Sequence, residues 1–598
     1  MSLVFCLCLM FFDSTINLIR ICSFISEFMT LVHQCRETRY VFICKTLVDV
    51  ALFIILFHPC PITKPYPPYN NVWQYNIYIY GWPSIITSHI SNSTFPLSVP
   101  MALFTVAILL VILGAMWVTL SHLKLRAGYR KLPPGPWGLP IIGSLYMLGS
   151  LPHRNLSRLA KKYGPIMFMR LGCVPTIVVS SPEAAKLVMK THDVVFASRP
   201  KLQAYEYLSY GAKGIAFTEY GPYWRHVRKL CALHLFSSAK INSFASVRKA
   251  EVGLLVKSVK EMASAGEVVD ISAKVAGVVE DMAYRMVFGH NKDRIFDLKT
   301  LIREATRLAG TFNLADYVPF LGPLDLQGLT QLLRTNNEAI DEVLDKIIDK
   351  HIQDVSKDEV NHMNFIDVVL SLMNKSNNFE DDPLYAIDRQ NAKAIILDIL
   401  VGGIDSSITS IEWVISELLR HPRVMRRLQE ELKNVVGMCR MVEESDLENL
   451  GYLNMVVKET LRLHPIGPFL VPRESIEDIV INGHYIPKKS RILINTWTIG
   501  RDPNVWSNNV EEFFPERFVE NNIDLQGHDF ELTPFGSGRR GCPGIQLGLI
   551  TVQLVVSQLV HCFNWKLPND TPPSELNMKE KFGLTMPRVD HLNIENLI

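Results

Sequence analysis

The chain has 598 residues, of which 48% are apolar, and its formal net charge at pH 7 is +2. The near-neutral charge gives no support for nucleic-acid binding, and the apolar content is sufficient for a large hydrophobic core. The cysteines after residue 100 form no CxxC pair, which argues against a zinc site or a disulfide framework. No repeat and no Gly/Ser-rich linker divides residues 141–598, so we expect one large domain there.

The first hundred residues differ from the rest of the sequence. Apolar segments such as "VDVALFIILF" alternate with polar ones such as "PITKPYPPYNN", and the only acidic residues are Asp13, Glu27, Glu37 and Asp49. No helical face persists, and the composition is not that of a transit peptide. We therefore expect residues 1–100 to be an extension of the gene model outside the fold, with Met101 as the natural start. The alternative is a genuine additional membrane segment around residues 46–57.

Residues 101–120, "MALFTVAILLVILGAMWVTL", predict a transmembrane helix. These residues carry no charge, and at about 1.5 Å of rise each they span the roughly 30 Å hydrocarbon core of a bilayer. The basic residues Lys124, Arg126, Arg130 and Lys131 follow, which predicts that the rest of the chain is cytosolic. Residues 121–140 end in "KLPPGPWGLP", so we expect a basic, proline-stiffened linker.

Three long apolar segments predict helices within residues 141–598: "NAKAIILDILVGGIDSSITSIEWVISELLRH", "NLGYLNMVVKETLRLHP" and "GIQLGLITVQLVVSQLVHCF". In the third segment, one helical face is formed by Ile545, Leu549, Val552, Val556 and Leu559. The short runs "TIVVSS", "DIVINGHYIP" and "RILINTW" predict strands. The expected fold class is therefore mainly α with small β-sheets.

The motif "GGIDSS" lies in the middle of the first long helical segment. Each mid-helix glycine costs about 1 kcal/mol relative to alanine, so the pair needs a reason. Gly402, Gly403 and Ser406 share one face and open a groove in which a small ligand such as O2 fits. Asp405 and Ser406 are candidate catalytic residues, because an acid and an alcohol can relay protons through water. The alternative is a helix-packing notch with a capping-type aspartate.

The loop "PFGSGRRGCPG" combines glycines, two arginines and one cysteine. A soft thiolate suits iron, and Cys542 is therefore a candidate metal ligand. Glycines such as Gly538 and Gly544 let a loop pass close to a flat macrocycle, and Arg540 suits a haem propionate. A buried structural cysteine is the alternative, but the fixed spacing of Phe535, Gly538, Arg540, Cys542 and Gly544 argues against chance.

With these motifs in this order, the sequence from Met101 to the C-terminus resembles the cytochrome P450 family, specifically the plant microsomal haem-thiolate monooxygenases. The resemblance implies the cytochrome P450 fold, a haem b cofactor and Cys542 as the proximal haem ligand. Where this chain has Ser406, the family usually has threonine, so the hydroxyl is kept and a methyl group is lost.

The resemblance also implies roles for residues whose patterns are uninformative alone. Trp224 and Arg228 stand at i and i+4, and with Arg473 of "VPRES" they match the family's propionate contacts. The Glu459-x-x-Arg462 pair and Arg517 of "PERF" match a structural triad on the proximal side of haem. An aromatic core residue and ordinary surface ion pairs are the alternatives for these residues.

Two further segments, "HPIGPFLVPR" and "KFGLTMPR", resemble substrate-contacting turns of the plant enzymes. Their apolar side chains suggest a lipophilic pocket or, alternatively, plain core: Ile466, Phe469, Leu470, Val471 and Leu584.

The resulting hypothesis is a monooxygenase of the endoplasmic reticulum membrane with a single membrane pass and a cytosolic catalytic domain. It would insert one oxygen atom of O2 into a small lipophilic plant metabolite, of the phenylpropanoid, flavonoid or terpenoid class. Electrons would come from NADPH through NADPH–cytochrome P450 reductase. The alternatives are a haem-thiolate isomerase or dehydratase that needs no O2, and a non-catalytic haem sensor or carrier.

Overall fold

The computed structural model describes residues 131–597, except for 290–294, 356–363, 377–386, 508, 520 and 522. The predicted extension over residues 1–100, the predicted transmembrane helix over residues 101–120 and the first half of the predicted linker lie outside the described residues.

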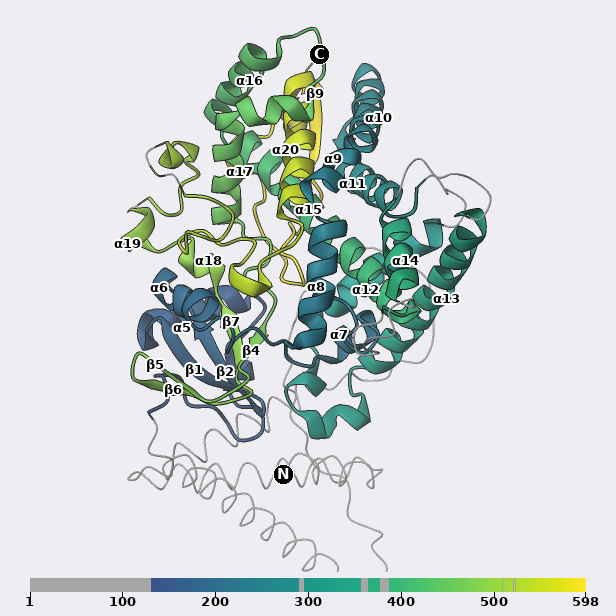
Figure 1. The fold of residues 1–598 in the computed structure, drawn as a ribbon. Coiled ribbons are helices and arrows are strands. Elements are labelled where there is room, and N and C mark those ends of the chain that lie inside the picture. Colours follow the sequence, from purple (N-terminus) through teal and green to yellow (C-terminus); the bar gives the residue numbers. More distant parts are fainter. Residues whose placement is uncertain are drawn as a thin grey trace, which may run out of the picture. The chain divides into compact units, whose positions relative to one another are not determined.

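The described residues form mainly helices, with short strands between some groups of helices (Figure 1). The helices are α5 (Pro152–Tyr163), α6 (Pro182–Lys186), α7 (Gln203–Leu208), α8 (Pro222–His234), α9 (Ser238–Ser243), α10 (Ala245–Ser264), α11 (Ile271–Phe288), α12 (Ile295–Ala309), α13 (Leu329–Val355), α14 (Phe365–Ser376), α15 (Arg389–Arg420), α16 (Pro422–Val436), α17 (Gly451–Leu463), α18 (Thr496–Ile499), α19 (Pro503–Trp506) and α20 (Ile545–Cys562). The strands are β1 (Ile166–Leu171), β2 (Val174–Val179), β3 (Val269–Asp270), β4 (Arg473–Glu474), β5 (Ile479–Ile481), β6 (His484–Ile486), β7 (Arg491–Ile494), β8 (Asn564–Lys566) and β9 (Asn593–Leu597).

The strands build three small sheets in the described part of the chain. The largest has the order β1-β2-β7-β4, in which β2 and β7 run parallel and the other neighbours antiparallel. The others are β3-β9-β8 and the hairpin β5-β6. The predicted strands "TIVVSS", "DIVINGHYIP" and "RILINTW" correspond to β2, to the β5-β6 hairpin and to β7, so the prediction of small sheets is confirmed.

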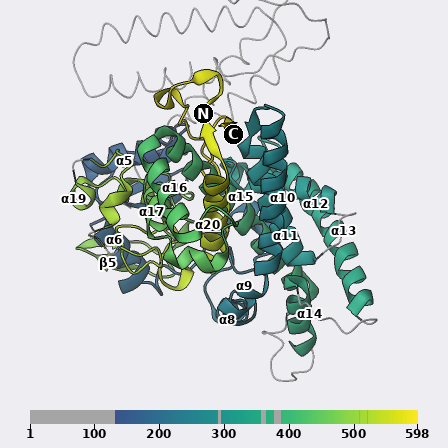
Figure 2. The same ribbon diagram turned by 90° about the horizontal axis from the view of Figure 1, so that it is seen from above.

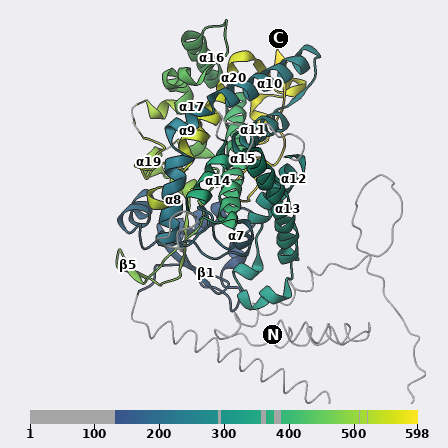
Figure 3. The same ribbon diagram turned by 45° about the vertical axis from the view of Figure 1, so that its right-hand side comes forward.

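The long helix α15 forms the centre of the helical part. It packs against α11, α14 and α20 (Figure 3), and seen from above α20 lies between α16 and α17 on one side and α10 and α11 on the other (Figure 2). A capping box starts α15: Asn391 N donates to the Asp388 carboxylate, and Asp388 N donates to Asn391 Oδ1, both at 2.8 Å. The predicted mainly helical fold class is confirmed.

Among the described residues, α15 and α20 are the helices long and apolar enough to cross a membrane. Large parts of both are buried inside the protein, because they form its core. The second half of the predicted linker lies against the sheets. Phe168 N donates to Pro134 O at 2.9 Å and Tyr485 N to Lys131 O at 2.8 Å, so this segment is fastened to β1 and β6.

Candidate active site

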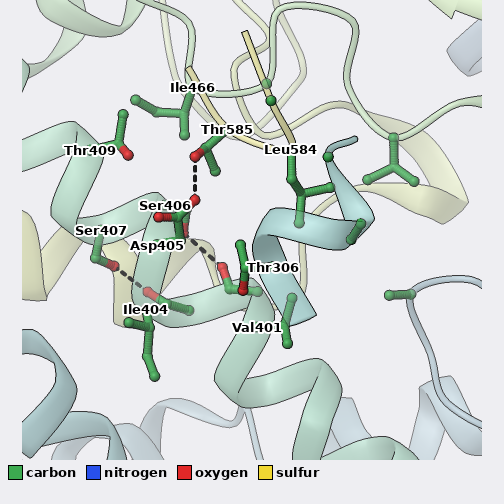
Figure 4. Close-up of a pocket in the computed structure, with 18 of the residues that line it drawn as sticks. Thr306, Val401, Ile404, Asp405, Ser406, Ser407, Thr409, Ile466, Leu584 and Thr585 are labelled. Atoms are coloured by element: carbon green, nitrogen blue, oxygen red, sulfur yellow. Dashed lines mark hydrogen bonds between the residues drawn. The ribbon is translucent and has the colours of Figure 1, made fainter. Parts of the chain in front are cut away.

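A cavity of about 1560 Å³ is lined by residues of α15, α12, the cysteine loop and the C-terminal turn that contains Leu584. Figure 4 shows the part around Asp405 and Leu584. Small-molecule pockets are commonly about 300–1000 Å³, so this cavity has room for more than one small ligand. Every candidate site residue from the cysteine loop and from the "GGIDSS" motif except Gly538 lines it.

The cysteine loop is held in shape by glycines and by a backbone hydrogen bond. Gly536 and Gly538 both have a backbone φ of 68°, which residues other than glycine rarely adopt. A Cβ on Gly538 would also lie 2.2 Å from Met189 O. Cys542 N donates to Phe535 O at 2.9 Å, which closes the loop just before α20. The local sequence therefore fixes where the thiol points.

The Cys542 thiol is solvent-accessible although it lies deep in the protein, because its free surface faces the cavity. Burial raises the pKa of the Cys542 thiol, while the Gly544 N–H and the positive charge of Arg228 act in the opposite direction. Gly544 is the N-cap of α20, so the N–H group that acts on the sulfur belongs to the N-terminus of this helix. Both groups stabilise a thiolate over a thiol.

Four arginines gather at the edge of the cavity: Arg199, Arg228, Arg473 and Arg540. Burial, together with the charges of Arg473 and Arg228, lowers the pKa of Arg540 to about 9. Burial and the charges of Arg540 and Arg473 also lower the pKa of Arg199. The guanidinium groups stay protonated at neutral pH, so this cluster is a concentrated positive charge. In the described part of the chain, its ion-pair partner is Asp193, 3.2 Å from Arg473.

The predicted contact residues have protein partners as well. Arg228 donates to Gly541 O at 2.7 Å and Arg473 to Ser537 O at 2.7 Å, so both arginines brace the cysteine loop. The Arg540 guanidinium stacks on the Trp224 ring, 4.0 Å from its centroid. The indole N–H of Trp224 donates to Ile215 O at 3.0 Å, so in this structure Trp224 supports the cluster by stacking.

The residues around the cavity fit haem, which is a flat dianion with a central iron. The arginine cluster lacks enough negative charge among its own neighbours, and two carboxylates would supply it. The cysteine thiol opens into the same cavity. On α15, Gly402 and Gly403 are exposed to the cavity, and an added Cβ on either would have no neighbouring atom within 4 Å. The glycines therefore leave an open space beside α15.

Asp405 and Ser406 lie side by side on α15 at this space (Figure 4). Ser406 Oγ donates to Gly402 O at 2.7 Å, one turn back along the helix. Asp405 accepts a hydrogen bond from Thr585 Oγ1, and burial raises the pKa of its carboxyl group while this bond lowers it. An acid with a raised pKa beside an alcohol is an arrangement that can pass protons.

The Glu459, Arg462 and Arg517 side chains form one buried network. Glu459 Oε2 accepts from Arg462 Nε at 2.7 Å, and Oε1 accepts from Arg517 Nε at 2.8 Å. The Glu459 and Arg462 side chains are completely inaccessible to solvent. The network ties α17 to the Pro515–Phe518 turn and does not line the cavity, as expected of a structural role.

The predicted lipophilic residues line the cavity, and some also belong to the core. Ile466 and Leu584 face the space around Asp405 (Figure 4), while Phe469 packs in a cluster with Leu493. Leu470 and Val471 are also lining residues. Some of these side chains therefore face the pocket, and others also belong to the hydrophobic core.

Sequence reasoning missed three residues of the site. Arg199 donates to Val471 O at 2.5 Å, Asp398 accepts from Ile215 N at 2.5 Å, and Thr585 donates to Asp405. Asp398 had a detectable signal, because an acid within an apolar helical segment needs a partner. The contacts of Arg199 and Thr585 join segments far apart in the chain, which no local pattern reveals.

Comparisons with known proteins identify the family. A family model described as Cytochrome P450 matches residues 133–592. The chain is 59% identical over 499 residues to Cytochrome P450 CYP736A12 of Panax ginseng, covering 83% of this chain and 98% of that relative. It is 43% identical over 456 residues to Cytochrome P450 71A1 of Persea americana, covering 74% and 89%.

Solved structures show the same fold. A zebrafish cytochrome P450 solved with progesterone superposes with a TM-score of 0.63 at 25% sequence identity, over 74% of this chain and 99% of that one. The extent of the family match and the identity to the plant relatives decide the assignment. This chain belongs to the cytochrome P450 family, as a plant haem-dependent monooxygenase.

Proposed function

We propose that this cytochrome P450 inserts one oxygen atom of O2 into a small lipophilic plant metabolite of the phenylpropanoid, flavonoid or terpenoid class. NADPH supplies two electrons through NADPH–cytochrome P450 reductase, and the second oxygen atom leaves as water. The observation that carries the proposal is the joint lining of one cavity by Cys542, the arginine cluster and the Asp405–Ser406 pair.

Each residue has a definite task in this reaction. Cys542 binds the iron as a thiolate, which the Gly544 N–H and Arg228 stabilise. Arg228, Arg473 and Arg540, with Trp224 stacked on the last, hold the carboxylates at the edge of the cofactor. Haem supplies the iron at which O2 is reduced and split.

Asp405 and Ser406 supply protons. Asp405 takes up a proton readily because burial raises the pKa of its carboxyl group. The Ser406 hydroxyl donates a hydrogen bond to Gly402 O in this structure. It can turn toward the open space beside Gly402 and Gly403 and pass a proton there. The neighbouring apolar side chains, such as Ile466 and Leu584, bind a lipophilic substrate and exclude water from it.

We also propose that the protein is anchored in the endoplasmic reticulum membrane by residues 101–120, with the catalytic domain on the cytosolic side. The support is the uncharged length of that segment and the basic residues that follow it.

The experiment uses the full chain in membranes with reductase, NADPH and a panel of phenylpropanoids, flavonoids and terpenoids under ¹⁸O2. We expect a product that contains one ¹⁸O atom, formed with consumption of NADPH. Product formed equally well without O2 and NADPH would instead indicate an isomerase or dehydratase. A bound haem that reductase and NADPH fail to reduce would indicate a carrier.

A further inference from the structure

Helix α15 carries three acidic residues at intervals of seven: Asp398, Asp405 and Glu412. Seven residues are close to two helical turns, so the three carboxyl groups share one face. All three line the cavity. Asp398 accepts hydrogen bonds from the backbone N–H groups of the loop at 215–216, and Asp405 accepts one from Thr585. The proposed function leaves Glu412 without a task.

The Glu412 carboxyl group is buried, and it forms no ion pair within the described part of the chain. The residue is 7% exposed, and burial raises the pKa of its carboxyl group. A hydrogen bond from Ser272 of α11 and the charges of Arg588 and His591 lower this pKa, and the charge of Asp405 raises it. Arg588 influences Glu412 through its charge. Its guanidinium donates a hydrogen bond to Ser416 Oγ at 2.6 Å.

Polar groups connect Glu412 to Asp405 on the inner side. Thr409 lies one turn from each along α15, about 6 Å of helix rise from Asp405 and about 4.5 Å from Glu412. Figure 4 shows Asp405, Thr409 and Thr585 pointing into the same part of the pocket. Single water molecules commonly bridge polar groups that make no direct hydrogen bond with each other.

The lining of the same cavity also includes polar residues of α11 and of the C-terminal segment. These are Ser272, Arg588 and His591. His591 is exposed, pairs with Asp270 at 2.8 Å, and has its pKa raised by that partner. A path of polar groups therefore extends from solvent at His591 through Glu412 and Thr409 to Asp405.

We propose that Glu412 is a proton-transfer residue that receives protons from solvent at His591 and passes them through Thr409 and cavity water to Asp405. The inference rests on the proposed function, because it replenishes the protons that Asp405 and Ser406 deliver. Along the path only proton-bearing bonds form and break: N–H bonds at the His591 ring and O–H bonds at the hydroxyl, the carboxyl groups and water. Each proton that leaves Glu412 for Asp405 is replaced from bulk water, and the electrons still come from NADPH.

The test is Glu412→Gln in the full-length, haem-loaded protein. Glutamine keeps the size of the side chain and a partner for Ser272, but its amide does not take up and release a proton near neutral pH. We expect unchanged haem content and substrate affinity, a several-fold lower ratio of product to NADPH consumed, and correspondingly more hydrogen peroxide. Thr409→Val, which breaks the same path without touching a carboxyl group, should act in the same direction.

A second measurement does not depend on turnover. In the substrate-free protein, at a pH low enough to protonate Asp405, the infrared band of this carboxyl group is identified by its loss in Asp405→Asn. Its proton should exchange with D2O several-fold more slowly in Glu412→Gln. The matched control is Glu280→Gln. Glu280 is also buried and lines the cavity, but its two oxygens accept from Arg303 at 2.6 and 2.7 Å, so its loss should leave both measurements unchanged.

The outcomes separate the two proposals. Wild-type coupling and wild-type exchange in both Glu412→Gln and Thr409→Val would overturn the proton path. A wild-type protein that forms no O2-dependent product would overturn the proposed function, and the exchange rates would still decide whether Glu412 feeds Asp405.

Discussion

The buried network around Glu459 gives the sharpest stability prediction. In Glu459→Ala, the Arg462 and Arg517 side chains lose their shared carboxylate, and Phe514 N loses its acceptor at 2.9 Å. Arg462 would keep its bonds to Gly500 O and Val510 O, both at 2.7 Å, but its charge would stay buried without a counter-ion.

The expected loss is large because the site is completely buried. Removing one partner of a buried ion pair costs about 3–5 kcal/mol, against a total stability of about 5–15 kcal/mol for a typical protein. The chain contains a matched control at the same spacing. Glu304 and Arg307 also pair at i and i+3, but their side chains are 38% and 56% exposed. Glu304→Ala should therefore cost at most about 1 kcal/mol.

The assay is denaturant unfolding of the haem-loaded, detergent-solubilised protein, followed by far-ultraviolet circular dichroism and by haem absorbance. We expect Glu459→Ala to lower both midpoints strongly and to release haem at lower denaturant concentration than Glu304→Ala. Equal midpoints for the two variants would refute the reasoning that burial, rather than pairing as such, gives this network its importance.

Three further predictions concern protons and the N-terminus. Ser406→Ala should keep haem binding but lower the ratio of product to NADPH and release more hydrogen peroxide, whereas Ser406→Thr should be coupled at least as well as the wild type; an unchanged ratio in Ser406→Ala would exclude the hydroxyl as the relay. Burial raises the pKa of Asp398 to about 6, so its contribution to stability is present at low pH and lost as the pH rises through 6. The free energy of unfolding of the wild type, relative to that of Asp398→Asn, should therefore increase as the pH is lowered from 7 to 5. A difference that does not change with pH would contradict this. A protein that starts at Met101 should insert into microsomes with full activity; loss of either property would show that residues 1–100 are needed.

The helices and the cysteine loop were predictable from sequence because their signals are local. The length and period of the apolar run in α20 predict a helix, and α20 is buried on nearly all sides from Thr551 to Val560. The glycines and arginines around Cys542 stand at set distances from it in the sequence, so the loop could be predicted to bind haem from a few residues.

The wider site was not predictable, because distant segments complete it. The Arg199 guanidinium reaches Val471 O across a sequence separation of 272 residues. Trp224 was expected to direct its N–H at a haem carboxylate, yet that N–H donates to Ile215 O and the ring stacks on Arg540. Such pairings depend on how the loop at 212–218 packs against α15, which a motif does not encode.

The central claim is that Cys542 binds haem iron as a thiolate in this cavity. The most direct measurement is the absorbance spectrum of the reduced, CO-bound protein for the wild type and for Cys542→Ala. The account predicts the thiolate-specific absorbance band in the wild type and its complete loss in Cys542→Ala. An unchanged band in the variant would show that another residue is the ligand and would contradict the account.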